Sequence, residues 1–486
     1  MMQTGENMEQ HQNKTINLTI DGFPVSVPAG TTILQAAEKI NVKIPTLCDY
    51  PDLCKRALCR ICVVECDGRD KLIAACAAEV SEGVRVVTGN LRVLGIRKTI
   101  LKLLLANHPN DCLACVKSQN CELQKLAITY GIRETPFRQT GKMQEREMSG
   151  ETLVRDMGKC VKCGRCVEVC QEIQNAGAIN SSNRSVNFRI SSPYGQDLEE
   201  GPCVFCGKCA SVCPVGALYP NDQSAEVIKA LNDSGQSAAA QVAPSAAKAL
   251  TEEAGLLPGS ITTGKITSAL KTLGFKKVYA ADYAANIAIQ QKTEELISRI
   301  KNKGRLPMIS ACSPGWNNFV KQNYPDLMEH NCKCENQEQV FGAFARDNFG
   351  TEKTDPEKIT AVSITTCLSK KYKAKYALVP AELTRLFYMK GIEPASQPEE
   401  PFDIPAIFTE ADSDAKALKA ALESGNNTGI NETAINLAGH NVKILTVNGI
   451  ANARKIMDQI REGKCGAALV DVRYCPECKS RKLSAD

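Results

Sequence analysis

The sequence predicts a multidomain protein whose N-terminal half is α+β and whose C-terminal half is α/β. Three observations predict this fold class. Residues 15–28 hold two alternating, strand-like runs around a short turn, and a helical pattern follows them. Four groups of closely spaced cysteines come next, between residues 48 and 213. Beyond residue 236, apolar strand-like runs alternate with helical patterns, as is typical of an α/β domain.

Length and composition indicate a globular protein without a membrane-spanning segment. The 486 residues suffice for about three domains of ordinary size. No stretch approaches the roughly 18 apolar residues of a spanning helix, and the first fifteen residues are polar. We therefore expect a cytoplasmic protein with no membrane partner. The formal net charge of +5 counts cysteines as neutral, and metal-bound thiolates would lower it, so it does not predict a nucleic-acid partner.

The twenty-four cysteines are best explained by metal, because a chain without an export signal meets a reducing cytosol. In the first group, a close pair is flanked by two distant cysteines in a C-x10-C-x2-C-x13-C pattern, formed by Cys48, Cys59, Cys62 and Cys76. Four thiolates at this spacing fit a [2Fe-2S] centre, with a zinc site as the alternative. Two further cysteines, Cys54 and Cys66, lie outside the pattern, and we expect them to be packed.

Residues 15–90 resemble a plant-type ferredoxin domain of β-grasp fold. The resemblance is stronger to the N-terminal domain shared by iron-only hydrogenases and the large iron–sulfur subunit of NADH dehydrogenases. The next string, HPNDCLACVKSQNCELQ, resembles the [4Fe-4S] module of the same families, which is held by one histidine and three cysteines. The resemblance implies that the ligands here are His108, Cys112, Cys115 and Cys121. An imidazole ligand would raise the cluster potential, and a structural zinc is the alternative.

The third and fourth groups, CVKCGRCVEVC and CVFCGKCASVCP, are two C-x2-C-x2-C-x3-C runs of the bacterial 2x[4Fe-4S] ferredoxin pattern. In that pattern the fourth cysteine of each run ligates the other cluster. One predicted cluster therefore has the ligands Cys160, Cys163, Cys166 and Cys213. The other has the ligands Cys170, Cys203, Cys206 and Cys209. The second run ends in Pro214, whereas Gln171 follows the first, which is expected to alter the turn and not the ligand count.

The C-terminal half resembles the catalytic domain of iron-only hydrogenases. A polar stretch, NDSGQSAAAQ, is predicted to be the linker into it. The segments QVAPSAAKALTEEAGLLPG, SACSPGW and NGIANARK carry the resemblance, which covers about residues 15 to 478. The expected organisation is a polar tail, a [2Fe-2S] domain, a histidine/cysteine [4Fe-4S] domain, a 2x[4Fe-4S] domain and a hydrogenase-like domain, at 1–14, 15–90, 91–145, 146–230 and 236–486.

The family's active centre depends on three cysteine motifs, and each departs from the pattern here. In SACSPGW, Cys312 falls on the proton-relay cysteine, and Ser313 replaces a ligand of the cubane. In TTCLSKK, Cys367 falls on a cubane ligand and Lys370 on the lysine that hydrogen-bonds the diiron cyanide. The third motif survives only as RYCPECKSRK, in which two cysteines, Cys475 and Cys478, are closer together than in the family and no glycine run follows.

These departures imply that the chain has no binding site for the diiron unit, because the family encloses that unit with glycine-rich backbone and one bridging cysteine. Two alternatives stay open. In one, four thiols hold a further [4Fe-4S] cluster or a zinc ion, namely Cys312, Cys367, Cys475 and Cys478. In the other, the pocket is packed. Three cysteines match no motif, Cys332, Cys334 and Cys465. A basic run, Lys370 to Lys375, could meet an acidic partner or form a solvated face.

Four predicted clusters in consecutive modules, with no dinucleotide or P-loop signature, indicate an electron carrier. The resemblance implies a multisubunit oxidoreductase with an FMN subunit that binds NAD(P)H and a small thioredoxin-like [2Fe-2S] subunit. Ferredoxin, or a further enzyme such as formate dehydrogenase, would be the other redox partner, and some such complexes bifurcate electrons at the flavin. We expect oxygen sensitivity, as in a protein of an anaerobe. The alternatives are a catalytic [FeFe] hydrogenase subunit and a redox sensor.

Overall fold

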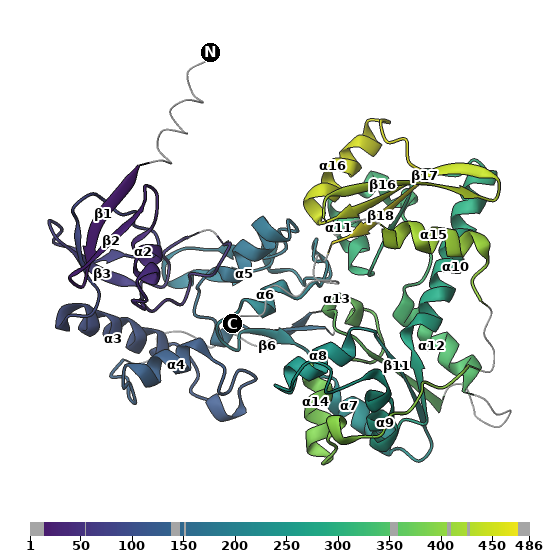
Figure 1. Ribbon diagram of the computed structural model, residues 1–486, viewed down its shortest axis with the longest axis horizontal. Coiled ribbons are helices and arrows are strands. Elements are labelled where there is room, and N and C mark those ends of the chain that lie inside the picture. The colour runs from purple at the N-terminus through teal and green to yellow at the C-terminus, as the bar shows by residue number, and fades with distance from the viewer. Residues whose placement is uncertain are drawn as a thin grey trace.

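The protein, seen in a computed structural model, is described at residues 14–53, 55–137, 146–149, 152–349, 358–405, 410–424 and 428–474. Along the chain, a small β-rich part is followed by a short helical part, a cysteine-rich part and a larger α/β part with two sheets (Figure 1). The predicted fold class, a multidomain α+β and α/β protein, is thereby confirmed. No helix in these ranges is long and apolar enough to cross a membrane.

The first part is a five-stranded mixed sheet of order β2-β1-β5-β3-β4 with one helix against it. Its elements are β1 (Thr15–Ile20), β2 (Phe23–Pro28), α2 (Ile33–Lys39), β3 (Val63–Cys66), β4 (Ile73–Ala74) and β5 (Arg85–Val87). Residues Asp21 and Gly22 both have positive φ, the geometry that a two-residue hairpin turn requires. A capping box at Thr32 and Gln35 starts α2. The central pair β1 and β5 is parallel, as in a β-grasp fold.

The second part contains two helices, α3 (Leu91–Ala106) and α4 (Glu122–Thr129), and a short 3₁₀ turn at Cys112–Ala114 between them. The side chain of Asn90 caps α3 by accepting from the backbone N–H of Val93. The loop between the helices carries the second cysteine group.

The third part is built from short elements around its cysteines. The sheet β10-β7-β6 and the hairpin β8-β9 have the bounds Leu218–Pro220, Leu153–Asp156, Arg146–Ser149, Asn180–Ser182 and Arg189–Ser191. Helices α5 (Arg165–Glu168) and α6 (Lys208–Ser211) follow the two cysteine loops. After α5 the chain continues as a π-helical turn, Val169–Ile173, where a proline would have ended it. The predicted change of turn at Gln171 is thus observed.

The fourth part has two four-stranded sheets. The first is all-parallel, of order β12-β11-β14-β15, with the bounds Lys277–Ala280, Ser237–Val242, Ile359–Ile364 and Ala377–Leu378. The second has the order β13-β18-β17-β16, with the bounds Met308–Ala311, Leu469–Arg473, His440–Asn448 and Ile430–Leu437. Only the β16–β17 pair of this sheet is antiparallel. Such parallel strands need helices on both faces.

Ten helices among the described residues belong to this part. They are α7 (Ser224–Asn232), α8 (Ala246–Glu253), α9 (Thr263–Leu273), α10 (Ala281–Lys301), α11 (Gly315–Asn323), α12 (Gln337–Asn348), α13 (Leu368–Lys371), α14 (Pro380–Met389), α15 (Ser413–Ser424) and α16 (Ile450–Arg461). Figure 1 shows α7, α8, α9 and α14 near the first sheet and α11, α15 and α16 near the second.

The predicted linker NDSGQSAAAQ is wrong for most of its length. Residues from Ser237 onward form β11, which is buried along its whole length between β12 and β14. The small side chains of Ala238, Ala239 and Ala240 permit close packing on both faces of the strand. Because alanine is only weakly apolar, the sequence gives a weak strand signal here. The preceding helix α7 packs on the same core through Val227, so this core begins before residue 236.

Candidate functional site

The first cysteine group converges inside the β-rich part. The thiols of Cys62 and Cys76 lie 3.3 Å apart, and the backbone N–H of Cys59 donates to Cys48 Sγ at 3.5 Å. All four side chains are at most 9% exposed. Contacts with the thiols of Cys59 and Cys76 lower the pKa of Cys48, which favours a thiolate. Four buried sulfurs facing one another are the donor set that a [2Fe-2S] centre needs.

Of the two cysteines outside that spacing, Cys66 lies in β3 and packs into the apolar core. Burial raises the pKa of its thiol, as expected for a packed, protonated side chain. The other, Cys54, lies outside the described residues.

The second group gathers between α3 and α4. Burial lowers the pKa of His108, so its imidazole stays neutral, the form that ligates metals. Its Nδ1 atom is buried and has no hydrogen-bond partner among the described residues. Burial raises the pKa of the Cys121 thiol, and the charges of Cys115 and Cys112 act in the same direction. A buried, unpartnered ring nitrogen in a segment that carries three cysteines fits the predicted ligand set.

The third and fourth groups exchange their last cysteines, as the spacing predicts. One small cavity is lined by the sulfur-bearing residues Cys160, Cys163, Cys166 and Cys213. A second is lined by Cys170, Cys203, Cys206 and Cys209. Burial raises the pKa of the Cys160 thiol to about 11 and that of Cys163 to about 12. Iron would offset this cost by supplying positive charge to the thiolates.

The two cavities have matching loops. The backbone N–H of Lys162 donates to Cys160 Sγ at 3.4 Å, and the N–H of Phe205 donates to Cys203 Sγ at the same distance. Both donors sit in left-handed backbone, at φ 56° and 51°. A third N–H, of Ala178, donates to Cys170 Sγ at 3.3 Å. Such bonds stabilise thiolate charge and tune cluster potential.

A single arginine joins the first three parts next to their cysteines. Arg165, which precedes Cys166, donates to the carbonyl of Asp49 at 2.8 Å and to both carboxylate oxygens of Glu122 at 2.7 and 2.9 Å. Asp49 follows Cys48, and Glu122 follows Cys121. One buried guanidinium therefore links three cysteine sites, because Arg165 and its two partners each adjoin a cysteine of a different site.

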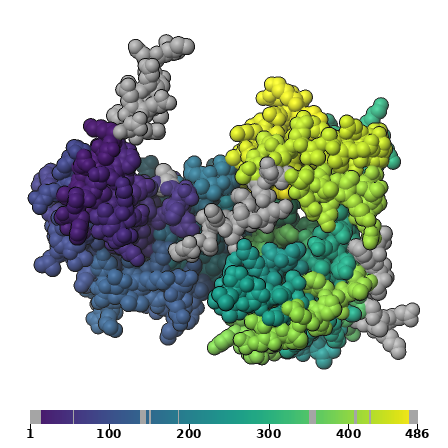
Figure 2. Space-filling model, viewed as in Figure 1, coloured from purple at the N-terminus to yellow at the C-terminus, as the bar shows by residue number. Residues whose placement is uncertain are grey.

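The loops of the first and third parts also touch directly. A Cβ on Gly164 would lie 2.9 Å from the Leu58 side chain, next to Cys59. A continuous apolar core runs from Leu47 through the cysteine loops of all three parts. The three N-terminal parts thus form one packed body (Figure 2).

The loop of the fourth cysteine group is in direct contact with the C-terminal part. The Ser369 hydroxyl donates to the carbonyl of Val204, between Cys203 and Cys206, at 2.7 Å. A Cβ on Gly315 would lie 2.5 Å from that carbonyl oxygen, so only glycine fits there. The glycine of the SACSPGW string therefore serves the contact between the two halves of the chain.

The three C-terminal motifs meet in a buried hydroxyl cluster. The Ser313 hydroxyl donates to the carbonyl of Ser369 at 2.6 Å and lies 2.8 Å from the Ser369 hydroxyl. The Tyr474 hydroxyl lies 2.7 Å from the Ser369 hydroxyl and donates to the carbonyl of Ser313 at 3.3 Å. The Tyr474 ring is fully buried and stacks on Trp316. One residue of each motif, Ser313, Ser369 or Tyr474, therefore belongs to a single buried hydrogen-bonded cluster.

Two other predicted residues lie beside this cluster. Burial raises the pKa of Tyr474 well above its usual value, and the charges of Cys312 and Cys367 act in the same direction. Lys370 Nζ is 3.3 Å from Glu338 and donates to the Gln337 side chain at 2.9 Å. The last two predicted thiols, Cys475 and Cys478, lie outside the described residues.

The basic run is not a solvated face throughout. Lys371 has a fully buried side chain that pairs with Glu382 at 2.6 Å and donates to the carbonyl of Asn221 at 2.6 Å. Lys373, by contrast, is half-exposed and lies 3.6 Å from Glu199. The prediction of a solvated or partner-facing run is therefore wrong for Lys371.

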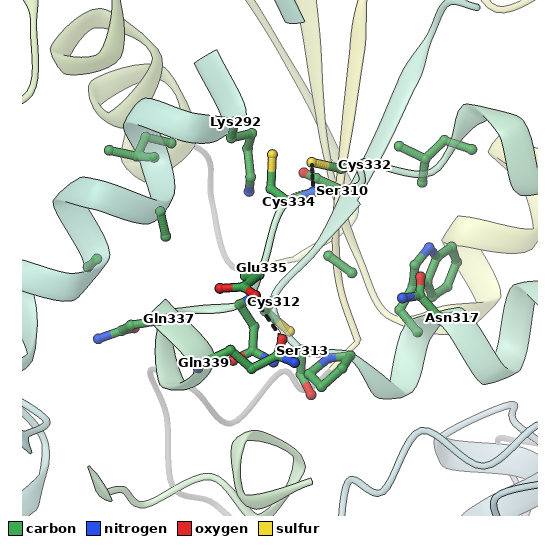
Figure 3. A pocket seen from close by; sticks show the side chains of 18 residues that line it. Lys292, Ser310, Cys312, Ser313, Asn317, Cys332, Cys334, Glu335, Gln337 and Gln339 are labelled. Carbon is green, nitrogen blue, oxygen red and sulfur yellow. Dashed lines mark hydrogen bonds between the residues drawn. The ribbon is translucent and has the colours of Figure 1, made fainter. Parts of the chain in front are cut away.

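A cavity of about 230 Å³ opens between β13, α10 and the segment before α12. Figure 3 shows Cys332, Cys334 and Lys292 on one side of it and Cys312 and Ser313 on the other. Cys332 and Cys334 match no motif in the sequence. Their C-x-C spacing was the one sequence signal of a possible metal site. Their carboxylate neighbour, Glu295, is too distant in sequence for the contact with them to be predicted.

Comparisons with known proteins agree with this organisation. The profile of the iron only hydrogenase large subunit, C-terminal domain, matches residues 236–478. A 2Fe-2S iron-sulfur cluster binding domain, the NADH-ubiquinone oxidoreductase-G iron-sulfur binding region and a 4Fe-4S dicluster domain match residues 13–90, 97–136 and 159–217. The chain thus carries domains for a 2Fe-2S and several 4Fe-4S clusters.

Similar proteins include hydrogenases and a hydrogenase subunit. The NADP-reducing hydrogenase subunit HndD of Solidesulfovibrio fructosivorans is 33% identical over 95% of this chain and 87% of its own length. Iron hydrogenase 1 of Clostridium pasteurianum is 32% identical over 74% of this chain and 62% of its own. A structure of [FeFe]-hydrogenase HydA1 from Chlamydomonas reinhardtii is 22% identical, with a TM-score of 0.44, over 52% of this chain and 82% of that chain.

Proposed function

The chain belongs to the family of iron-only hydrogenase large subunits, and from this membership we propose that it is the electron-relaying subunit of a cytoplasmic NAD(P)-linked oxidoreductase complex. In this proposal, electrons pass between a flavin subunit and ferredoxin or another redox enzyme, and hydrogen is not the substrate of this chain. A small thioredoxin-like [2Fe-2S] subunit is the further partner. The reducing cytoplasm suits a chain whose described cysteines form no disulfides.

The observation that carries the proposal is the serial contact of the cysteine sites. Arg165 ties the first two sites to the third, the third and fourth exchange Cys213 and Cys170, and Val204 of the fourth touches the C-terminal motifs. The clusters would supply one-electron transfer. The chain's own residues hold them at fixed spacing and donate N–H groups to the ligating sulfurs, which tunes the potentials.

The same geometry supports the ligand assignments of this proposal. Cys48, Cys59, Cys62 and Cys76 would hold the [2Fe-2S] centre. His108, with the three cysteines of its loop, would hold the first [4Fe-4S] cluster, and the two cysteine-lined cavities would hold the other two. These four centres contain about fourteen iron atoms.

The hydroxyl cluster supports the absence of hydrogen chemistry in this chain. The hydroxyl of Ser313 is a harder ligand than a thiolate and therefore a poor substitute for it on iron. This hydroxyl also already donates a hydrogen bond to the carbonyl of Ser369. The Tyr474 ring occupies the space beside it. We infer that the C-terminal part holds no cubane there and serves as the docking and terminal part of the relay.

A second candidate function is hydrogen oxidation or proton reduction by this chain. Two observations favour it: Cys312 and Lys370 stand at the family's relay and cyanide-binding positions, and a cavity opens beside Cys312. The two candidates differ in one assay, because only the second gives hydrogen-dependent reduction of a dye.

Replacing Cys209 with serine is expected to remove about four iron atoms per chain, because the second cavity loses one of four ligands. The complex, purified from its source cells without oxygen, should then still reduce its N-terminal centres with NAD(P)H but pass no electrons to its acceptor. Iron analysis and freeze-quenched electron paramagnetic resonance check this. Cys66→Ser, a buried thiol outside every site, is the matched control and should keep all its iron. Full electron transfer in Cys209→Ser would contradict the relay.

A further inference from the structure

Three side chains of the C-terminal part converge away from every predicted iron site. Glu295 lies on α10, and Cys332 and Cys334 lie in the segment that leads into α12. Their ligand atoms all lie within 4.8 Å of one another. Both thiols donate to the same carboxylate oxygen, Glu295 Oε2, from Cys332 Sγ at 3.2 Å and from Cys334 Sγ at 3.1 Å.

The fold holds both the carboxylate and the C-x-C segment in place. Arg299 binds the other carboxylate oxygen, Glu295 Oε1, with Nε at 3.0 Å, which leaves Oε2 facing the sulfurs. The N–H of Lys333 also donates to Oε2, at 2.9 Å. The N–H of Cys332 donates to the carbonyl of Ile309 at 2.6 Å, which fixes the C-x-C segment against β13.

Arg299 orders the same segment from its other side. It donates to the carbonyls of His330 and Asn331 at 3.0 and 2.7 Å. One side chain, Arg299, thus holds both the carboxylate and the backbone just before the two cysteines. This arrangement is typical of outer residues that orient metal ligands.

We propose that Glu295, Cys332 and Cys334 form a binding site for one divalent zinc ion. Tetrahedral zinc with bonds of about 2.3 Å to sulfur and about 2.0 Å to oxygen sets the sulfur–oxygen separation at roughly 3.5 Å. The observed 3.1 and 3.2 Å are shorter by a few tenths of an ångström, as hydrogen-bonded thiols should be. On binding, the two thiol protons pass to solvent and zinc takes their place between sulfur and oxygen.

The proposed site borders the cavity of about 230 Å³ between β13 and α10. Cys332 and Cys334 both line this cavity, on the side where Lys292 lies (Figure 3). A water molecule is the expected fourth ligand, because three protein ligands and an open position are the pattern of zinc sites accessible to small molecules. A [4Fe-4S] cluster is a poorer fit, since such clusters are usually held by four cysteine thiolates and this site offers two.

The surrounding charges suit a cation with three anionic ligands. Two thiolates, one carboxylate and Zn²⁺ together carry a net charge of about −1. Arg299 contacts the carboxylate, and Lys292, paired with Asp471 at 3.2 Å, lines the same side of the cavity as both cysteines (Figure 3). The site is separate from the electron relay and does not depend on it, so the two proposals can fail independently.

The test uses the full chain with its iron intact. Anaerobic protein is dialysed against Zn²⁺ with a competing chelator, and zinc, iron and labile sulfide are counted on the same sample. The wild-type chain should retain about one zinc more than Cys332→Ser and Cys334→Ser, with equal iron in all three. Zinc-edge X-ray absorption should show two sulfur neighbours and oxygen neighbours in the wild type.

The matched control is Cys465→Ser, which removes a half-buried thiol from the same part of the chain and should bind zinc like the wild type. Glu295→Gln should weaken zinc binding at least tenfold with iron unchanged. Equal zinc in the wild type and the two cysteine variants would overturn the proposal. So would zinc that appears only in samples that have lost iron, or alkylation that finds a Cys332–Cys334 disulfide instead of free thiols.

Discussion

Replacing Lys371 with methionine is expected to lower the stability of the C-terminal part by about 3–5 kcal/mol, because a buried carboxylate then has no cationic partner. The Lys371 side chain is 0% exposed and that of Glu382 is 4% exposed. Lys371 Nζ lies 2.6 and 2.9 Å from the two carboxylate oxygens. Methionine leaves the Glu382 charge with one backbone donor, the N–H of Val379.

The pH dependence of this loss follows from the direction of one pKa. Burial already raises the pKa of Glu382, even with Lys371 beside it. In the variant that pKa rises further, so the carboxyl group binds a proton more readily in the folded than in the unfolded chain. A raised folded-state pKa favours folding at low pH. The deficit should therefore shrink as the pH falls and grow as it rises.

Native-state hydrogen exchange on the full chain measures the effect, through the opening free energy of amides in α14 and β14. The double variant Lys371→Met with Glu382→Leu is the control, and it should recover most of the loss because no unpaired charge remains. Equal protection in the single variant and the wild type would mean that the pair is not buried as described.

Replacing Tyr474 with alanine is expected to cost about 3–5 kcal/mol, the range for removing a large buried aromatic side chain. The ring is 0% exposed, and its centroid lies 6.5 Å from that of Trp316. Its hydroxyl joins Ser369 to the carbonyl of Ser313. Alanine therefore leaves both a cavity and two polar groups with fewer partners.

Tyr474→Phe separates these two causes. It keeps the ring, so it should cost only about 1 kcal/mol, the value of one net hydrogen bond. Exchange protection of the β18 amides is the measurement, and the iron content of both variants should equal that of the wild type. An alanine variant as stable as the wild type would show that the ring does not fill a buried space beside Trp316.

The cysteine spacing contained more of the site than any other feature. Contacts within each group are local, so their spacing determines which sulfurs can share one metal. Even the exchange of Cys170 and Cys213 could be predicted, because the fourth cysteine of each run is carried away from its own loop by the helix that follows. Strands β12, β13, β14, β17 and β18 of the C-terminal part were also visible as apolar runs.

Contacts between distant segments were not predictable. Glu295 is one acidic residue on a charged helix, and nothing local distinguishes it as the neighbour of Cys332 and Cys334. Lys371 sits in a run of basic residues, and its burial depends on Glu382 of the next helix. Strand β11 was missed because three alanines give a weak apolar signal, although they are buried between two neighbouring strands.

The measurement that tests the central claim most directly is made on one anaerobic sample of the full chain. Iron and labile sulfide are quantified, and hydrogen-dependent reduction of a dye is assayed on the same preparation. The relay account predicts about fourteen iron atoms per chain and no hydrogen activity. Sustained hydrogen turnover would contradict it, because the C-terminal part would then hold a working hydrogen-converting centre despite Ser313 and Tyr474.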